Sequence, residues 1–245
     1  MSTELRNYFN HELGAEPWKA SDLITFFHAQ RTGGSALRHL LGDALGKERV
    51  FCTQFVSDFQ HWEVVPAERL LEKTVFAGHS NFQRRDLGRR LLPISLVRHP
   101  VYRTFSLYYY CKKYPNQFLH HLTESRDLQA FYAAASAKKP NYFHNVCCQR
   151  ICGKADFELA RTTLERDYLL VGCTERMGDF VQVLFDFLGV PRVEVDQRET
   201  DHDRYKQHLH LTDFIETLKR KNSEDLKLFE YMNRTYFHID EYLYP

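Results

Sequence analysis

Residues 24–41, ITFFHAQRTGGSALRHLL, constrain the fold more than any other stretch of this 245-residue chain. The first five of these residues are β-branched or aromatic, as in a buried strand, whereas apolar residues recur at helical spacing from residue 36 onward. Residues 30–35 must therefore form a tight turn between a strand and a helix. Gly33 and Gly34 would let the backbone of this turn approach a ligand closely.

The predicted turn has the chemistry of an anion-binding site. The first N–H groups of the following helix would point into it, and its side chains add one positive charge and two hydroxyls. A turn without any ligand would look similar, because two adjacent glycines are a weak signal by themselves. The candidate residues for binding a phosphate or a sulfate are Arg31, Thr32, Gly33, Gly34, Ser35 and Ala36.

The turn is not of the ATP and GTP type, because the pattern G-x-x-x-x-G-K-[ST] is absent. Residues 26–35 instead resemble the phosphosulfate loop F-I-H-x-P-K-T-G-G-T of sulfotransferases that use 3′-phosphoadenosine 5′-phosphosulfate (PAPS), in particular the heparan sulfate 2-O- and 6-O-sulfotransferase group. Gln30 stands where proline is usual, and Arg31 stands where lysine is usual. The resemblance implies a P-loop-NTPase-like α/β fold with a central parallel sheet flanked by helices, in a soluble, bacterial-type member of the group.

The stretch LVRHPVYRTFSLYYYCKK contains a second candidate anion site. Pro100 suits the first position of a helix, so Arg98 would lie at the end of the preceding strand. Arg103 and Ser106 are three residues apart and share one helix face, where they could join Arg98 in binding an anion. A strand-capping arginine and a solvent-facing serine would be the simpler interpretation. The stretch resembles the 3′-phosphate motif R-D-P-x-x-R-x-x-S-x-Y, with His99 in place of aspartate.

Three further segments continue the resemblance. Residues 170–176, LVGCTER, resemble V-G-x-T-E-R-F, and residues 222–229 resemble N-x-x-D-x-x-L-Y. Residues 145–153 match the pattern N-x-Q-x-R-x-L-x-G only at its first, seventh and ninth positions. The match is therefore weakest where an acceptor would be contacted.

The resemblance implies in-line transfer of a sulfuryl group from PAPS to a hydroxyl, which leaves adenosine 3′,5′-bisphosphate (PAP) and needs no metal. Arg31 would act electrostatically, because a guanidinium is essentially never deprotonated. His79 is the candidate general base, since it follows a predicted strand and resembles the catalytic histidine segment of the group. His61, next to Trp62, is the second candidate, and a histidine satisfied by backbone contacts is the simpler interpretation.

The acceptor class stays open at this point. A carbohydrate hydroxyl on a glycan or glycoconjugate is the first hypothesis; a small metabolite or a tyrosyl peptide is the second, and a nucleotide-binding module without turnover is the third. The arginines of residues 84–90 would suit an anionic sugar polymer, but a solvated loop explains them equally well. These arginines are Arg84, Arg85, Arg89 and Arg90.

Charge and composition argue against nucleic acid, membrane and metal partners. Thirty-three Lys and Arg against 32 Asp and Glu give a net charge of +1, so no global field would recruit nucleic acid or an acidic membrane. Residues 1–22 are rich in charge and lack a continuous apolar run, so we expect no stable membrane insertion and a cytoplasmic location. The six cysteines lack paired zinc spacing, and we expect reduced core thiols and no metal site.

The chain as a whole predicts one domain over residues 1–245, with an N-terminal extension at residues 1–22 and a flexible loop at residues 192–207. Alternating strands and helices predict a parallel sheet. Strands are predicted at residues 24–28, 74–78, 91–97 and 168–174, and helices near residues 66–72, 127–137, 142–151, 156–166, 177–188, 211–221 and 224–236.

Overall fold

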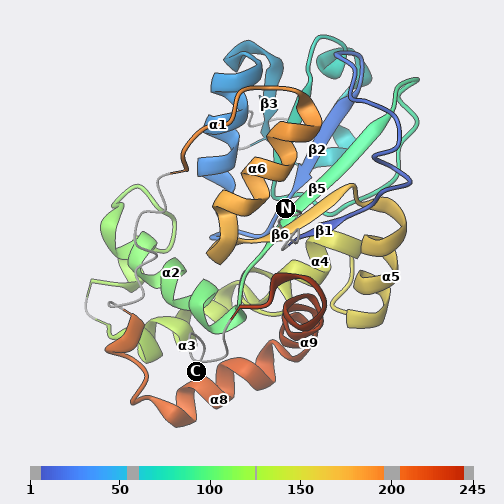
Figure 1. Ribbon diagram of the computed structural model, residues 1–245. Coiled ribbons are helices and arrows are strands. Elements are labelled where there is room, and N and C mark those ends of the chain that lie inside the picture. Colours follow the sequence, from blue (N-terminus) through green and yellow to red (C-terminus); the bar gives the residue numbers. More distant parts are fainter. Residues whose placement is uncertain (1–6, 54–60, 125, 196–204, 240–245) are drawn as a thin grey trace.

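A six-stranded sheet with the order β1-β6-β5-β2-β4-β3 forms the centre of the molecule (Figure 1). The structure is a computed structural model that describes residues 7–53, 61–124, 126–195 and 205–239. Five neighbouring strands are parallel, and β1 is antiparallel to β6, which confirms the predicted α/β class with a mostly parallel sheet. The strands are β1 (Tyr8–Phe9), β2 (Leu23–Phe27), β3 (Val50–Cys52), β4 (Val75–Gly78), β5 (Leu91–Val97) and β6 (Leu170–Cys173).

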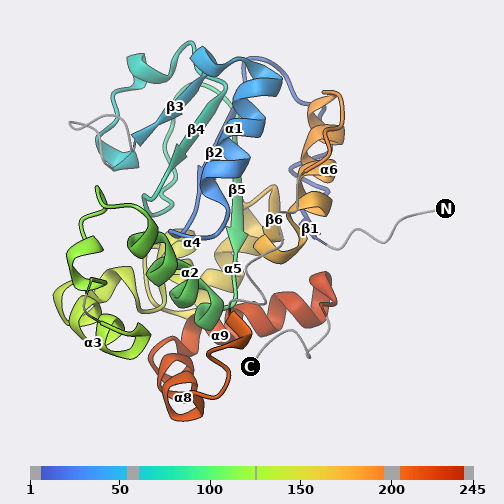
Figure 2. The same cartoon turned by 90° about the vertical axis from the view of Figure 1, so that its left-hand side faces the viewer.

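Helices cover both faces of the sheet. Helices α1 and α6 lie on one face and α4, α5 and α9 on the other, while α2, α3 and α8 pack together beyond the carboxyl ends of the strands (Figure 2). The helices are α1 (Gly34–Leu45), α2 (Pro100–Lys113), α3 (Leu128–Lys138), α4 (Val146–Cys152), α5 (Phe157–Asp167), α6 (Met177–Leu188), α8 (Thr212–Lys221) and α9 (Ser223–Met232).

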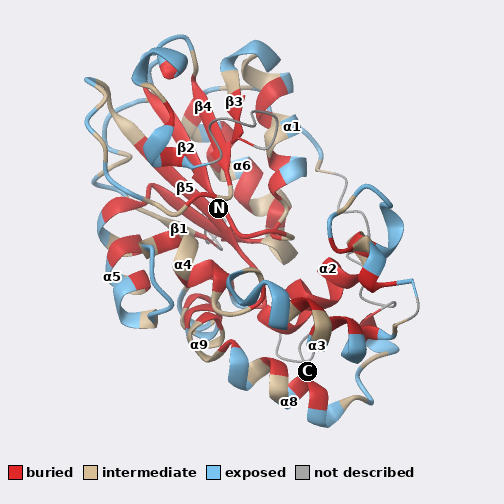
Figure 3. Ribbon diagram, turned by 180° about the vertical axis from the view of Figure 1, so that it is seen from behind, coloured by how far each residue is buried: buried red, intermediate tan, exposed pale blue. Residues whose placement is uncertain are grey.

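Strand β2 is buried on both of its faces because other elements pack against each side of the sheet there. Ile24 and Phe26 pack into the apolar cluster under α1 and α6, whereas Phe27 packs on the opposite face against Trp62 and Phe76. This alternation follows the two-residue period of a strand. Figure 3 shows the result, with buried residues along the strands and exposed residues on the outer loops.

The strand register brings three loops to one edge of the sheet. Phe27 pairs with Gly78 of β4, and Phe26 pairs with Ile94 of β5. The turn after β2 therefore lies between the loops that follow β4 and β5. In open parallel sheets this edge, outside the carboxyl ends of the strands, is the usual position of ligand sites.

Local sequence signals located several helix ends correctly. Helix α2 begins at Pro100, and α6 ends before Gly189, which is left-handed with φ 65°. Helix α4, however, covers Val146–Cys152 rather than the predicted residues 142–151, because Asn145 has a left-handed backbone with φ 49° and separates it from the turn before. Asn145 thus limits α4 to seven residues.

Other predicted elements are shorter than expected. The helix predicted at residues 66–72 is the 3-10 turn Ala67–Leu70, and the strand predicted at residues 168–174 contains only β6. The last predicted helix consists of α9 followed by the π-helical turn Asn233–Phe237. Each element therefore exists, but its hydrogen-bonded part is smaller than the apolar pattern.

Two short strands were not predicted. Strand β1 lies within the segment expected as an N-terminal extension, where Asn10 N–H donates to the Leu169 carbonyl at 2.8 Å. Strand β3 forms the opposite edge of the sheet. Of the loop predicted at residues 192–207, residues 196–204 lie outside the described residues, whereas Tyr205 is buried.

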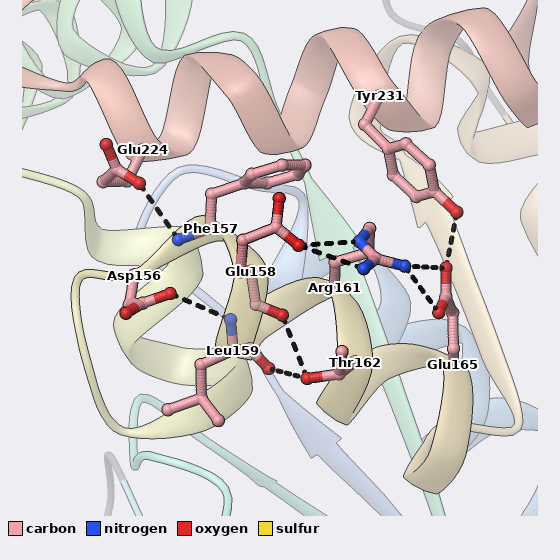
Figure 4. A network of polar contacts seen from close by, with 9 residues as sticks. All are labelled: Asp156, Phe157, Glu158, Leu159, Arg161, Thr162, Glu165, Glu224 and Tyr231. Carbon is pink, nitrogen blue, oxygen red and sulfur yellow. Dashed lines mark hydrogen bonds and ion pairs between the residues drawn. The ribbon is translucent and has the colours of Figure 1, made fainter.

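A polar network fastens α5 to α9 (Figure 4). Asp156 caps α5 by accepting from Leu159 N–H at 2.9 Å, and the Glu224 carboxylate accepts from Phe157 N–H at 3.1 Å. The Tyr231 hydroxyl of α9 donates to Glu165 of α5 at 2.5 Å. Helix α9 is thereby joined to α5 at both ends of their contact.

All six cysteines are free thiols, and all except Cys152 are buried. No helix in the described part of the chain is both long and apolar enough to span a bilayer.

Candidate active site

The turn between β2 and α1 contains two residues with a left-handed backbone. Arg31 and Gly33 both have positive φ, 71° and 87° respectively. The buried Thr32 hydroxyl donates to the Ala29 carbonyl at 2.8 Å, so it closes the turn from inside. Helix α1 begins at Gly34 with no side chain capping its N-terminus. Its first-turn N–H groups are therefore available to an anion.

Gly34 is required by the space around the turn. A Cβ atom built on Gly34 would lie 1.8 Å from Nε2 of His28, so no other residue fits without displacing that ring. Ser35 and Ala36 are exposed on the open side of the turn. The close approach at Gly34 is therefore that of the His28 ring, and ligand binding at this turn stays a prediction.

The two candidate anion sites meet in the structure. Arg31 Nε donates to Ser106 Oγ at 3.1 Å, and its guanidinium lies 4.1 Å from the ring centre of Tyr110. Arg98 Nη1 donates to the Arg31 carbonyl at 3.0 Å. The end of β5 and the first turns of α2 therefore contact the turn after β2, and Arg31, Arg98 and Ser106 form one cluster.

The charges in this cluster favour an anion. Burial lowers the pKa of Arg31, and the nearby charge of Arg98 lowers it further. Burial alone would also lower the pKa of Arg98, but Tyr205 and Glu175 more than offset this and leave the pKa raised. Two adjacent guanidinium groups repel each other, so an anion bound beside them would stabilise both.

Arg98 keeps its charge in a buried position, where only 6% of the residue is exposed. Its Nε lies 3.4 Å from Oε1 of Glu175, and Nη2 donates to the Tyr205 hydroxyl at 3.4 Å. Within the described part of the chain, neither Nε nor that carboxylate oxygen has a hydrogen-bond partner. The pair is therefore held by charge rather than by a hydrogen bond.

Arg103 has a different role from the one predicted. It is fully buried, and Nη1 and Nη2 donate to the carbonyls of Tyr142 at 3.2 Å and Phe143 at 2.8 Å. This geometry corrects the expectation that Arg103 and Ser106 share an anion-binding face. Both terminal nitrogens of Arg103 instead fix the main chain before α4.

His79 follows β4 and lies next to the turn. Its Nδ1 is 3.1 Å from the His28 carbonyl, which can only accept, so Nδ1 carries the proton and Nε2 of the neutral ring is an acceptor. Burial lowers the pKa of His79 to about 4; this hydrogen bond opposes the shift, and the charges of Arg150, Arg38 and Arg31 add to it. His79 is thus neutral at pH 7, as a general base must be.

The other two histidines considered are placed differently. His61 is exposed and precedes a 3-10 turn. His28 is buried and stacks on Phe26 with ring centres 4.2 Å apart, and burial holds its pKa well below the usual value. His28 therefore packs against the turn at Gly34, whereas the pKa of His79 is lowered in part by the charge of Arg31.

The arginines of residues 84–90 hold the fold together. Arg85 donates to the carbonyls of Trp62 at 2.6 Å and Val65 at 2.9 Å, and the more exposed Arg84 pairs with the buried carboxylate of Asp167. These contacts differ from both a free basic surface and a solvated loop.

Arg89 and Arg90 fasten the same loop to the start of β2. Arg89 donates to four carbonyls, including that of Asp22 at 2.5 Å. Arg90 donates to the Asp22 carboxylate at 2.6 Å. These two guanidinium groups are occupied within the protein, which leaves them little capacity to bind an acceptor.

The segments with weaker family resemblance form a reciprocal clasp between α4 and α9. The Asp225 carboxylate accepts from Cys147 N–H and Cys148 N–H, each at 2.9 Å. In return, Asn145 Oδ1 accepts from Glu224 N–H at 3.0 Å and from Asp225 N–H at 3.2 Å. Each helix therefore has its N-terminus capped by the other, a role that the motifs alone did not reveal.

Together these features define an α/β protein with a candidate anion site at the carboxyl edge of its sheet. In the described part of the chain no group of three or more His, Cys, Asp or Glu side chains could hold a metal ion. No protein-family model matches the sequence.

The chain is similar to a sulfotransferase in sequence. It is 28% identical over 178 residues to "Heparin sulfate O-sulfotransferase" from Drosophila melanogaster, a match that covers 65% of this chain and 48% of that protein. The chain thus spans about half the length of this curated relative. Among solved structures, mouse sulfotransferase SULT7A1 complexed with PAP aligns at a TM-score of 0.40 and 18% identity, over 81% of this chain and 67% of that one. This similarity in sequence agrees with the resemblance carried by the loop motifs.

Proposed function

We propose that this protein transfers a sulfuryl group from PAPS to a hydroxyl. The observation that carries the proposal is the meeting of Arg31, Arg98 and Ser106 at the uncapped N-terminus of α1. An uncapped helix N-terminus with buried guanidinium groups suits a ligand with two separate anionic groups. The similarity to an O-sulfotransferase supports the choice of PAPS over other such ligands.

In this proposal the two arginines have separate tasks. The N–H groups after Gly33 and the guanidinium of Arg31 bind the phosphosulfate and stabilise the charge that develops on the leaving phosphate. Arg98, assisted by Ser106, binds the 3′-phosphate. The positive charges and the helix N-terminus supply this stabilisation without a metal.

His79 is the proposed general base. Its Nε2 accepts the proton of the acceptor hydroxyl while the hydroxyl oxygen bonds to sulfur and the bond from sulfur to the bridging phosphate oxygen breaks. The hydrogen bond from Nδ1 to the His28 carbonyl fixes the required tautomer. A pKa near 4 keeps the ring unprotonated over the physiological range.

The proposed acceptor is a carbohydrate hydroxyl on a glycan or glycoconjugate. The named activity of the relative from Drosophila supports this class. Aromatic rings also support it: Tyr110, which lies against Arg31, contacts Tyr114 at 4.8 Å, and Phe118 contacts Tyr142 at 5.4 Å between ring centres. Tyr114 and Phe118 are 41% and 49% exposed, so a sugar ring could stack on them.

A small metabolite or a tyrosyl peptide is the second candidate acceptor, since the same exposed rings would stack on a phenol. Transfer of labelled sulfate from PAPS to desulfated glycans, simple phenols and tyrosyl peptides separates these classes. We expect glycan labelling that persists in the presence of EDTA. Binding of PAP without transfer to any of the three would contradict turnover and favour a nucleotide-binding module.

Variants at two positions separate chemistry from binding. His79→Ala should lower kcat by roughly 10²–10⁴-fold, the usual contribution of a positioned base, and leave the affinity for PAP nearly unchanged. Arg31→Ala should lower kcat and also weaken PAP, because its guanidinium contacts the ligand before and during transfer. Steady-state kinetics and calorimetry measure both quantities. Wild-type turnover in His79→Ala with loss in His61→Ala would show that the base has been misassigned.

A further inference from the structure

The loop that carries His79 is held by one residue of α4. Arg150 Nη1 donates to the side-chain carbonyl of Asn81, and the Arg150 carbonyl accepts from Phe82 N–H at 2.8 Å. Asn81 and Phe82 follow His79 by two and three residues. Arg150 therefore contacts this loop with both its side chain and its main chain.

Helix α4 is itself held in place from outside. It has only seven residues, and its N-terminal N–H groups bind the Asp225 carboxylate of α9. Asn145, immediately before α4, accepts from two N–H groups at the start of α9. These hydrogen bonds between α4 and α9, the α4–α9 clasp, thus help to fix the position of Arg150.

The charge of Arg150 also acts on His79. The described titratable groups that act on this imidazole come from four elements: Arg150 of α4, Arg38 of α1, Arg31 of the turn, and His28 at the end of β2. The three arginines favour the neutral ring, and Arg150 has the largest effect among them on the pKa. Removing its charge should therefore raise the pKa of His79.

The guanidinium of Arg150 has hydrogen-bonding groups that its contact with Asn81 does not use. Within the described part of the chain its Nε is buried without a hydrogen-bond partner. Burial lowers the pKa of Arg150, a shift that the Tyr142 hydroxyl opposes. The charge of Arg150 is therefore only partly compensated by the groups around it.

We propose that Arg150 is a positioning residue, which orients His79 through Asn81 and Phe82 and places a positive charge near its imidazole. This rests on the proposed function, in which His79 is the base. Arg150 would act without touching the acceptor or PAPS. In this proposal the α4–α9 clasp contributes to catalysis indirectly, because it holds Arg150 in place.

Three variants separate the effect of the hydrogen bond between Arg150 and Asn81 from the effect of the Arg150 charge. Arg150→Gln removes the charge, Arg150→Lys keeps the charge but loses the planar fork, and Asn81→Ala keeps the charge and removes its partner. We expect kcat to fall about 10- to 100-fold in Arg150→Gln and in Asn81→Ala, as for other displaced catalytic groups, with the affinity for PAP unchanged. The midpoint of the acidic limb of the kcat profile should rise by about one pH unit in Arg150→Gln only. A normal circular dichroism spectrum and melting temperature show that each variant is folded.

A readout without substrate keeps the test independent of turnover. The His79 ring proton signal, identified by its loss in His79→Gln, is titrated by NMR in the wild type and in each variant. A higher pKa in Arg150→Gln, with the wild-type value in Arg150→Lys and Asn81→Ala, supports the proposal. Unchanged pKa and kcat in Arg150→Gln overturn it, and so does a rise in KM for the acceptor with kcat unchanged, which would make Arg150 an acceptor contact. Wild-type turnover in His79→Ala would refute the base assignment, while the titration would still report on Arg150.

Discussion

Arg98 shows how a buried charge can be kept for a ligand. Its neighbours Glu175 and Tyr205 raise its pKa, but the ion pair with Glu175 lacks hydrogen-bond geometry. Nη1 donates to the Arg31 carbonyl, which joins the two segments proposed to bind anions. The side chain is therefore fixed and charged, and it remains able to bind an anion.

Replacing Arg98 should affect one phosphate selectively. We expect Arg98→Ala to weaken PAPS by about 2–4 kcal/mol, the cost of losing a desolvated charge-assisted contact, and hardly to change the affinity for adenosine 5′-phosphosulfate, which lacks the 3′-phosphate. Calorimetric titration with both nucleotides measures the difference. Ser106→Ala should show the same selectivity with a smaller loss of affinity. Equal losses of affinity for the two nucleotides would contradict the assignment of Arg98 to the 3′-phosphate.

At the scale of the element, the start of α1 depends on a glycine that leaves no room for a side chain. Gly34→Ala would place Cβ 1.8 Å from Nε2 of His28, so we expect a loss of about 1–3 kcal/mol in stability and a marked loss of PAP affinity. Urea unfolding and calorimetry measure the two effects. Gly42→Ala is the matched control in the same helix, since its nearest atom would be 3.4 Å away.

A double variant tests the cause of that loss. His28→Ala should restore part of the stability of Gly34→Ala, because it removes the ring that the new methyl group would meet. Strictly additive effects would show that Gly34 is required for another reason.

The clasp between α4 and α9 makes a separate prediction about stability. Asp225→Ala leaves two buried N–H groups of α4 without a partner, so we expect a loss of about 2–4 kcal/mol in the free energy of unfolding. Asp156→Ala, which removes a single exposed cap from α5, should cost only about 1 kcal/mol. Equal losses in urea unfolding would mean that the clasp contributes no more than an ordinary cap.

Elements were predictable where the signal is local. Pro100 starts α2 and Gly189 ends α6 through the conformations that these residues prefer. The start of α4 was not predictable, because its capping carboxylate comes from Asp225, more than 70 residues away. Strands β1 and β3 have two and three residues, and only their pairing in the sheet defines them.

The same distinction applies to the candidate site. Arg31, Arg98 and Ser106 follow from two motifs. Arg103 and the arginines of residues 84–90 could not be assigned, because their partners are carbonyls and carboxylates distant in sequence. Arg150 lies one position after the arginine expected in the motif, so its contact with Asn81 also became visible only in the structure.

At the scale of the whole molecule, buried neutral histidines predict sensitivity to acid. Burial lowers the pKa of His28, and lowers that of His79 to about 4 and that of His99 to about 3. Below pH about 6.5 these histidines bind protons in the unfolded chain but not in the folded chain. The free energy of unfolding therefore falls as the pH falls. We expect a slope that approaches about 1.4 kcal/mol per pH unit for each such histidine once the pH is well below 6.5.

Urea unfolding between pH 7 and pH 5 measures this slope. His99→Asn should reduce it, because it removes one buried imidazole, and it should also supply the side-chain cap that α2 lacks. Arg161→Gln, a change on the surface of α5, should leave the slope unchanged. A wild-type stability that does not vary with pH in this range would contradict the inferred neutral state of these histidines.

Strand β1 has a consequence for how this protein behaves at high concentration. Its two residues occupy the free side of β6, and Tyr8 adds a hydrogen bond from its hydroxyl to the Glu165 carbonyl at 2.8 Å. An uncovered edge strand offers its backbone to any other chain that can pair with it, which is a route to aggregation. The first strand therefore covers this side of β6, and a shortened form beginning at β2 should expose β6 and self-associate at high concentration.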